Sequence, residues 1–160
     1  MTKKNKLRLE YLLVVAGKEV KYLEQTTQRL SVEKIDMDWV AQLDAKPELA
    51  ERIDAFVARF GRLQDNLGDK LIPEFLRQML ETPKTAIDNL NRMEKLGLLT
   101  SVLDWVEARN LRNRLVHEYV DDNQEFAESI NRAIELVELL VDTHKLLSSY
   151  ASEHFVVLNN

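Results

Sequence analysis

Residues 49–67 read LAERIDAFVARFGRLQDNL, and their apolar positions follow one another in steps of four and three. Such spacing places the apolar side chains on one face of an α-helix, because a helix completes a turn every 3.6 residues. This face consists of Leu49, Ile53, Phe56, Phe60, Leu63 and Leu67. The stretch therefore predicts a helix that packs along its whole length. Pro47 suits its first turn, and Gly68 and Pro73 are expected to kink or break it.

The same helical periodicity continues along the chain, whereas the alternation expected of β-strands is almost absent. A first helix is predicted from about residue 6 to residue 30. Another is predicted over about 102–120, with Thr100 or Ser101 as its N-cap. The last helix is expected to follow its N-cap Asp122.

Two regions between these helices have weaker signals. Residues 31–46 could form a short helix or a surface loop. Thr82 as N-cap and Pro83 as first helical residue predict a further helix, which Gly97 ends. Its expected buried face consists of Ala86, Ile87, Leu90 and Met93. Together these patterns predict an all-α protein, an antiparallel up-and-down bundle of four to five helices.

Composition limits the class of protein further. At 160 residues, the chain is expected to form a single domain over 1–160. It has no cysteine, which fits a reducing, cytoplasmic location, and no apolar run approaches the roughly 20 residues that span a bilayer. The net charge of -5 argues against a general polyanion binder. Any contact with RNA would need a local basic patch.

A second stretch, residues 109–119, reads RNLRNRLVHEY. At about 100° per residue, Arg112 falls near the middle of the apolar arc of its helix. Because burying an uncompensated charge is costly, Arg112 must meet an anion. One interpretation is a structural salt bridge to Asp65, Asp69 or Glu74 of a neighbouring helix. The other is an anionic ligand.

A polar row runs beside Arg112. Arg109, Asn113 and His117 follow one another at intervals of four, while Arg114 lies on the opposite side of the helix. Arginine binds phosphate through its planar fork, and histidine exchanges protons near neutral pH. Arg112 and His117 are about 140° apart around a regular helix. They would converge on one phosphate only if the helix ended at His117 or two copies met across a two-fold axis.

The motif Arg112-Asn113-x-x-x-His117-x-Tyr119 resembles the R-x4-H-x-Y signature of the HEPN superfamily. In particular it is similar to the HepT-like toxins of HEPN/MNT toxin-antitoxin pairs. The segment RFGRLQDNLGDKL over residues 59–71 also looks HEPN-like. The resemblance covers most of the chain and implies an up-and-down helical bundle.

The resemblance implies a ribonuclease that works as a homodimer, with no metal and no cofactor. His117 would act as general base or acid on RNA, Arg112 would hold the phosphate, and Asn113 would help to position it. Arg109 and Arg114 are further candidates for substrate binding, because a dimer would bring six arginines of this stretch together.

The resemblance also implies a protein partner. In HepT-like toxins, a nucleotidyltransferase antitoxin of the MNT type attaches AMP to the motif tyrosine, and Tyr119 matches that position. Two alternatives remain open. One is a non-catalytic HEPN-type partner or substrate-binding module of a nucleotidyltransferase, and the other is a dimeric scaffold in which Arg112 forms a structural ion pair. Trp39 and Trp105 are expected to be packing anchors, and His144 a core or dimer-interface residue.

Overall fold

The computed structural model of the chain describes residues 3–117 and 122–155, with only the backbone at His117. Its helices are α1 (Lys3–Leu30), α2 (Met37–Ala41), α3 (Pro47–Asp65), the π-helix η1 (Asn66–Leu71), α4 (Ile72–Gln78), α5 (Ala86–Lys95), α6 (Val102–His117) and α7 (Asn123–His154). No strand occurs within these ranges, which confirms the prediction of an all-α protein. None of the described helices is both long and apolar enough to cross a membrane.

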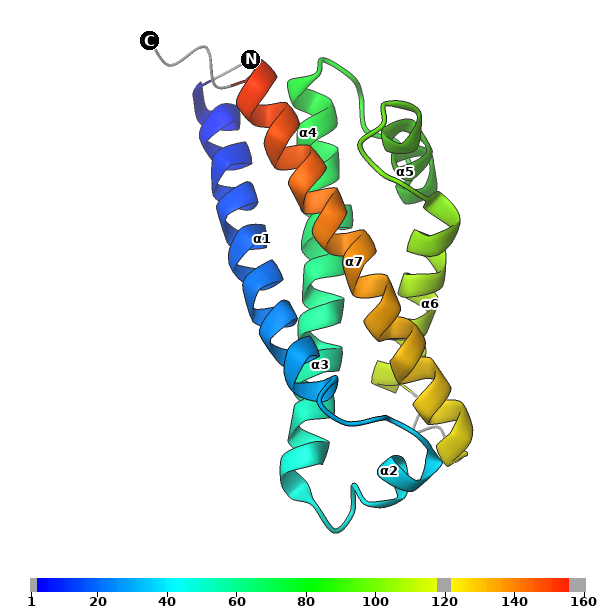
Figure 1. Cartoon of the computed structure of the whole chain (residues 1–160). Coiled ribbons are helices and arrows are strands. Elements are labelled where there is room, and N and C mark those ends of the chain that lie inside the picture. The colour runs from blue at the N-terminus through cyan, green and yellow to red at the C-terminus, as the bar shows by residue number, and fades with distance from the viewer. Residues whose placement is uncertain (1–2, 118–121, 156–160) are drawn as a thin grey trace.

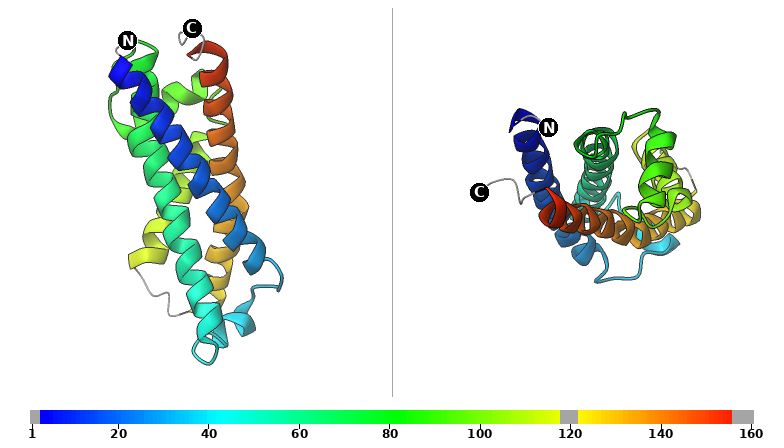
Figure 2. Two further views of the ribbon diagram at one scale, coloured as in Figure 1. Left: turned by 90° about the vertical axis from the view of Figure 1, so that its left-hand side faces the viewer. Right: turned by 90° about the horizontal axis from the view of Figure 1, so that it is seen from above.

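Four long helical segments form a bundle, namely α1, the rod made of α3, η1 and α4, then α6, and α7. Followed along the chain, they alternate in direction, and α1 begins at the end of the bundle where α7 finishes (Figures 1 and 2). Helix α1 packs against α3 and α7, and α6 packs against the same two helices from the other side. The short helices α2 and α5 contact α7 and α6 respectively, so the helices outnumber the four to five predicted.

The core is built around the apolar face predicted for residues 49–67. All six predicted residues are at most 5% exposed, and Phe56, Phe60, Leu63 and Leu67 are fully buried. The rings of Phe56 and Phe60 stack with centroids 5.6 Å apart and an interplanar angle of 16°. Trp39 and Trp105 are also buried, which confirms them as packing residues.

The rod is not broken at Gly68 or Pro73. Instead α3 passes into the π-helix η1, where the N–H of Ile72 donates to the carbonyl of Leu67, five residues earlier. The ring of a proline normally clashes with the carbonyl of the preceding helical turn, and a wider turn relieves this clash. Pro73 therefore occupies the first turn of α4 within a continuous rod.

Helix α5 begins three residues after the predicted start. Its N-cap is Thr85, whose hydroxyl accepts a hydrogen bond from the N–H of Asp88 at 3.2 Å, so the prediction of a start at Thr82-Pro83 is wrong. The cause is a competing local contact, because the side chain of Asn89 binds the backbone of Lys84 and keeps that segment outside the helix. As a result Ala86 and Ile87 are exposed, and only Leu90 and Met93 of the predicted face are buried.

The remaining boundaries agree with the sequence patterns. Residues 31–46, predicted as a short helix or a surface loop, contain the short helix α2. Its N-cap Asp36 accepts a hydrogen bond from the N–H of Trp39 at 2.9 Å. Ser101, one of the two candidate caps for α6, accepts from the N–H of Asp104 at 3.1 Å. Asp122 caps α7 as predicted. The predicted end of α6 near residue 120 lies outside the described residues.

Candidate functional site

A cleft of about 690 Å³ lies between the rod and α6, bordered by α5. Four cationic side chains line it: Arg62, Lys70, Arg109 and Arg112. Only two carboxylates, Asp65 and Asp69, line the same cleft. The chain as a whole carries a net charge of -5, so this excess of positive charge is a local feature. A cleft lined by one sign of charge concentrates ligands of the opposite sign.

Arg112 lies in this cleft, and part of its guanidinium is bound to neighbouring side chains. Its Nη2 is 3.0 Å from Oδ2 of Asp65, and its Nη1 donates to Oδ1 of Asn113 at 3.3 Å. Its Nε is buried and has no partner among the described atoms. A guanidinium has five N–H donors, so these two bonds orient the group and leave donors for an anion. The predicted salt bridge therefore exists, with Asp65 as the partner. It leaves N–H donors of the Arg112 guanidinium free to bind an anion.

The rod holds Arg112 in place through close packing. A Cβ atom on Gly61 would lie 2.8 Å from Nε of Arg112 and 3.1 Å from its Cγ, so only glycine leaves room for the stem of the arginine. Next to it, the amide of the buried Gln64 donates to the carbonyl of Ala108 at 3.1 Å, which fixes the rod against α6. Gly61, Gln64 and Asp65 thus form a seat for one cationic group.

Replacing Gly61 by alanine tests this seat. We expect the added methyl group to push the arginine stem away from Asp65 and to reduce any activity that depends on Arg112 by at least about tenfold. Stability should change little, because alanine favours a helix over glycine by about 1 kcal/mol and offsets the crowding. The measurement is the substrate or anion affinity of purified Gly61→Ala together with its thermal unfolding.

The matched control is Gly17→Ala on α1. There a Cβ would meet the ring of His144 at ordinary contact distances, 3.4 Å from Cε1 and 3.5 Å from Nε2. This variant should keep wild-type affinity and gain slightly in stability. Equal affinity of the wild type and Gly61→Ala would show that the position of the Arg112 stem does not matter.

The other predicted site residues divide between the cleft and other surfaces. Arg109 and Asn113 line the cleft beside Arg112. Arg114 does not, because it lies on another side of α6 and its Nη2 is 2.5 Å from Oε1 of Glu125 on α7. The side chain of His117 and the whole of Tyr119 lie outside the described residues.

Two further predictions concern residues away from the cleft. Glu74, a possible partner of Arg112, is buried elsewhere, where Arg77 lies 3.0 Å and Arg8 3.6 Å from its Oε2. His144 is half-buried between α7 and α1, with Nε2 at 3.1 Å from the carbonyl oxygen of Leu13. This position agrees with its prediction as a packing residue.

Arg62 and Lys70 were not among the site residues predicted from the sequence. Arg62, Asn66 and Lys70 follow one another at intervals of four, which is the spacing of the polar row on α6. The same rule therefore identifies a second polar row on the rod. All three residues line the cleft.

A carboxylate lies behind this second row. Glu19 of α1 accepts a hydrogen bond from the side-chain amide of Asn66, and its other oxygen is buried without a partner in the described structure. Burial raises the pKa of Glu19, against the opposing effects of the Asn66 hydrogen bond and of the charges of Arg62 and Lys70. Glu19 is thus a half-buried acid whose charge acts on the cationic row.

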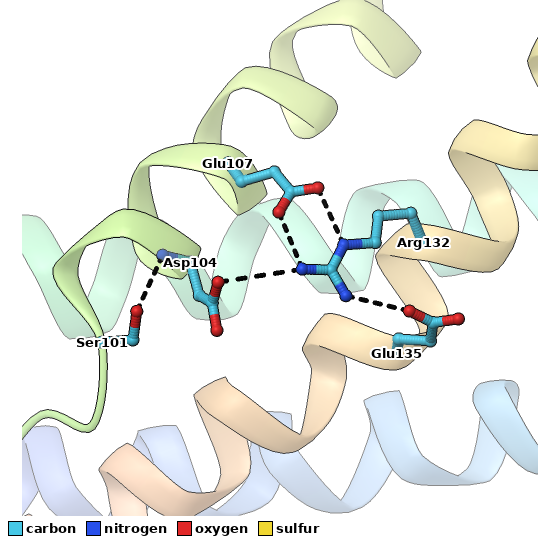
Figure 3. Close-up of polar contacts among 5 residues, drawn as sticks. All are labelled: Ser101, Asp104, Glu107, Arg132 and Glu135. Atoms are coloured by element: carbon cyan, nitrogen blue, oxygen red, sulfur yellow. Dashed lines mark hydrogen bonds and ion pairs between the residues drawn. The ribbon is translucent and has the colours of Figure 1, made fainter.

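A polar clamp fixes α6 against α7 (Figure 3). Arg132 of α7 binds both carboxylate oxygens of Glu107 at 2.8 Å each, and its Nη1 lies 2.9 Å from Oε2 of Glu135. Asp104, whose N–H donates to Ser101, lies 3.8 Å from Nη2 of the same arginine. The hydrogen bonds from Arg132 hold the pKa of Glu107 below its usual value, and the charge of Arg132 adds to this effect.

The lowered pKa of Glu107 predicts a pH dependence. Stabilisation from a carboxylate with a depressed folded pKa is fully present above its ordinary pKa and is lost as the pH falls through the folded value. We therefore expect Glu107→Gln to be less stable than the wild type at pH 7, and the difference to shrink at roughly pH 3. Urea unfolding at both pH values measures it. The exposed Glu24 serves as control, and an equal pH response of Glu107→Gln and Glu24→Gln would contradict the clamp.

The fold and the site define an all-helical bundle with a cation-lined cleft between its rod and α6. No protein-family model, curated protein or solved structure matches the chain. Among the described residues, no group of three or more acidic or histidine side chains is placed to hold a metal ion. Chemically, the cleft offers guanidinium, ammonium and amide donors, which are the groups that bind phosphate oxygens.

Proposed function

We propose that this chain is a metal-independent ribonuclease of the HEPN type, the toxin of a HEPN/MNT toxin-antitoxin pair, which acts in the cytoplasm as a homodimer. The observation that carries the proposal is Arg112, seated in a cationic cleft by Asp65, with donors left for a phosphate. It belongs to the motif that resembles the R-x4-H-x-Y signature. Asn113 and Arg109 line the same cleft, as a shared substrate site requires.

The proposed reaction is internal transesterification of RNA. The 2'-hydroxyl attacks the adjacent phosphorus, a bond forms between O2' and phosphorus, and the bond to the leaving 5' oxygen breaks. His117 accepts the proton of the 2'-hydroxyl or supplies the proton that the leaving 5' oxygen takes up, and the second of these two protons is exchanged with solvent. Arg112 stabilises the charge that grows on the phosphate oxygens, and Asn113 positions the phosphate. The products carry a cyclic phosphate and a free 5'-hydroxyl, so no water is consumed in this step.

In a dimer, two copies of α6 could bring Arg112 and His117 to the same phosphate, which one regular helix does not allow. Helix α6 runs from Val102 to His117, and positions 112 and 117 of a regular helix lie about 140° apart. Pairing two copies would let an arginine of one meet a histidine of the other. Val116, which lies within the motif stretch of α6 and is 48% exposed, offers apolar surface for such a contact.

Regulation is part of the proposal. AMP attached to Tyr119 by an MNT-type nucleotidyltransferase would add negative charge to the same motif as Arg112, which is proposed to bind RNA phosphates. Modification should therefore silence the enzyme. Tyr119→Phe should stay active and escape silencing.

The deciding experiment is induction of this chain alone in bacteria, with wild type beside His117→Ala. Growth arrest and new cyclic-phosphate RNA ends with the wild type only would support the nuclease, and EDTA should not change cleavage by the purified protein. Equal growth and unchanged RNA, with both proteins folded, would instead favour a non-catalytic partner of a nucleotidyltransferase. Loss of activity with EDTA would contradict the proposed mechanism.

A further inference from the structure

The wall of the cleft opposite α6 carries its own cationic row. Arg62 at the end of α3 and Lys70 in η1 flank Asn66, and none of the three belongs to the motif on α6. The proposed chemistry at one phosphate uses Arg112, Asn113 and His117 only. Arg62 and Lys70 therefore have no part in it.

These two cations keep their charge available. Within residues 3–116 and 122–155, neither Arg62 nor Lys70 forms a salt bridge, and neither does Arg109. Of the two carboxylates in the cleft, Asp65 is bound to Arg112. Glu19 lies behind the row and is bound to Asn66. The cleft as a whole thus carries four cations against its two lining carboxylates and Glu19 behind the row.

The backbone of this wall is π-helical at Asn66 and Lys70, two residues of the row. Residues Asn66–Leu71 form a π-helix, and three of its residues besides Asn66 line the cleft: Gly68, Asp69 and Lys70. Short π-helical segments are rare and occur frequently at functional sites. The wider turn sets where Lys70 lies relative to Arg62, because it replaces a regular α-helical turn between them.

We propose that Arg62 and Lys70 form a second phosphate position, which holds the RNA strand at a nucleotide next to the one bound by Arg112. This inference rests on the proposed function and names how the cleft recognises its substrate. Two cationic rows on facing walls suit a ligand with repeated phosphates.

The cleft would contact the backbone of the strand more than its bases. Trp105, the aromatic residue among its lining residues, is only 4% exposed and offers no ring face for a base to stack on. The accessible groups are cations and amides, which bind phosphates and sugars without reading sequence. Binding should therefore depend strongly on salt and weakly on sequence.

The test measures binding of a fluorescent single-stranded RNA with 2'-O-methyl groups, which lacks the attacking hydroxyl and cannot be cleaved. The variants are Arg62→Ala and Lys70→Ala, with Arg29→Ala and Lys145→Ala as controls. The control residues are exposed on α1 and α7 and do not line the cleft, so each control removes the same charge elsewhere. Thermal unfolding checks that each variant is folded.

We expect Arg62→Ala and Lys70→Ala each to weaken binding roughly three- to tenfold, whereas the controls bind like the wild type. The slope of log K against log salt should fall by about 0.7 for each lost phosphate contact on a single strand. Glu19→Gln should act in the opposite direction and tighten binding roughly two- to fivefold, because it removes the charge behind the row. The glutamine retains an oxygen that can accept the hydrogen bond from Asn66. The variant therefore changes the charge near the row without removing a cation.

The outcomes separate the two proposals. If the wild type cleaves RNA but all variants bind alike, the second phosphate position is wrong and the ribonuclease stands. If the wild type binds neither RNA nor its analogue while folded, both fail. Competition with inorganic phosphate and a nucleoside triphosphate completes the test, and a triphosphate that binds far more tightly than the RNA would overturn a strand-binding cleft.

Discussion

Arg112→Ala is expected to lower the rate of RNA cleavage by about 100- to 1,000-fold, because the phosphate loses its charged donor in the transition state. Stability should fall by less than about 1 kcal/mol, since the carboxylate of Asp65 is already 48% exposed and regains water. Cleavage of purified RNA under single-turnover conditions measures the rate. Circular dichroism during heating measures the stability.

The conservative variant separates charge from geometry at the same site. Arg112→Lys keeps the charge but cannot donate a planar pair of hydrogen bonds, so its rate should lie between those of the wild type and Arg112→Ala. Arg29→Ala, at the exposed end of α1, controls for the loss of one arginine. If Arg112→Ala cleaved RNA at the wild-type rate, Arg112 would be only a structural partner of Asp65, as in the scaffold interpretation.

Phe60→Ala is expected to destabilise the fold by about 3–5 kcal/mol. Phe60 is fully buried and stacks on Phe56, on the apolar face of α3 that packs into the core. Truncation removes buried apolar surface and leaves a cavity that the packed bundle cannot close. Urea unfolding followed by circular dichroism gives the free energy of unfolding.

The control for Phe60→Ala is Val32→Ala, which truncates a side chain that is 80% exposed in the turn after α1. Its free energy of unfolding should stay within about 0.5 kcal/mol of the wild type. A cost below about 1 kcal/mol for Phe60→Ala would mean that the bundle does not depend on this stripe.

Much of the fold could be predicted because the apolar spacing of each long helix repeats over several turns. The start of α5 could not, since Thr82-Pro83 is as good a start signal as Thr85. Which one caps the helix depends on the contact of Asn89 with the backbone of Lys84. The π-helix was missed for a similar reason, because Gly68 and Pro73 indicate an interruption without specifying its form.

The site could be predicted in part. Helix geometry required an anion for Arg112 and named Asp65 among three possible partners, but only the packing of the rod against α6 selects it. The space at Gly61 is equally a property of two packed elements. Arg62 and Lys70 could have been predicted, because with Asn66 between them they follow one another at intervals of four. Arg114 could not be excluded, because its partner Glu125 lies on another helix, α7.

The π-helix of residues Asn66–Leu71 makes chain length at this point informative for comparing homologues. A π-helical turn holds one residue more than the α-helical turn it replaces. A homologue lacking one residue here could wind the whole rod as α-helix, which would remove the wider turn from the wall of the cleft while every later side chain kept its direction relative to α3. An alignment gap within this segment would then mark a chain with a different wall opposite α6, even where the R-x4-H-x-Y residues are intact.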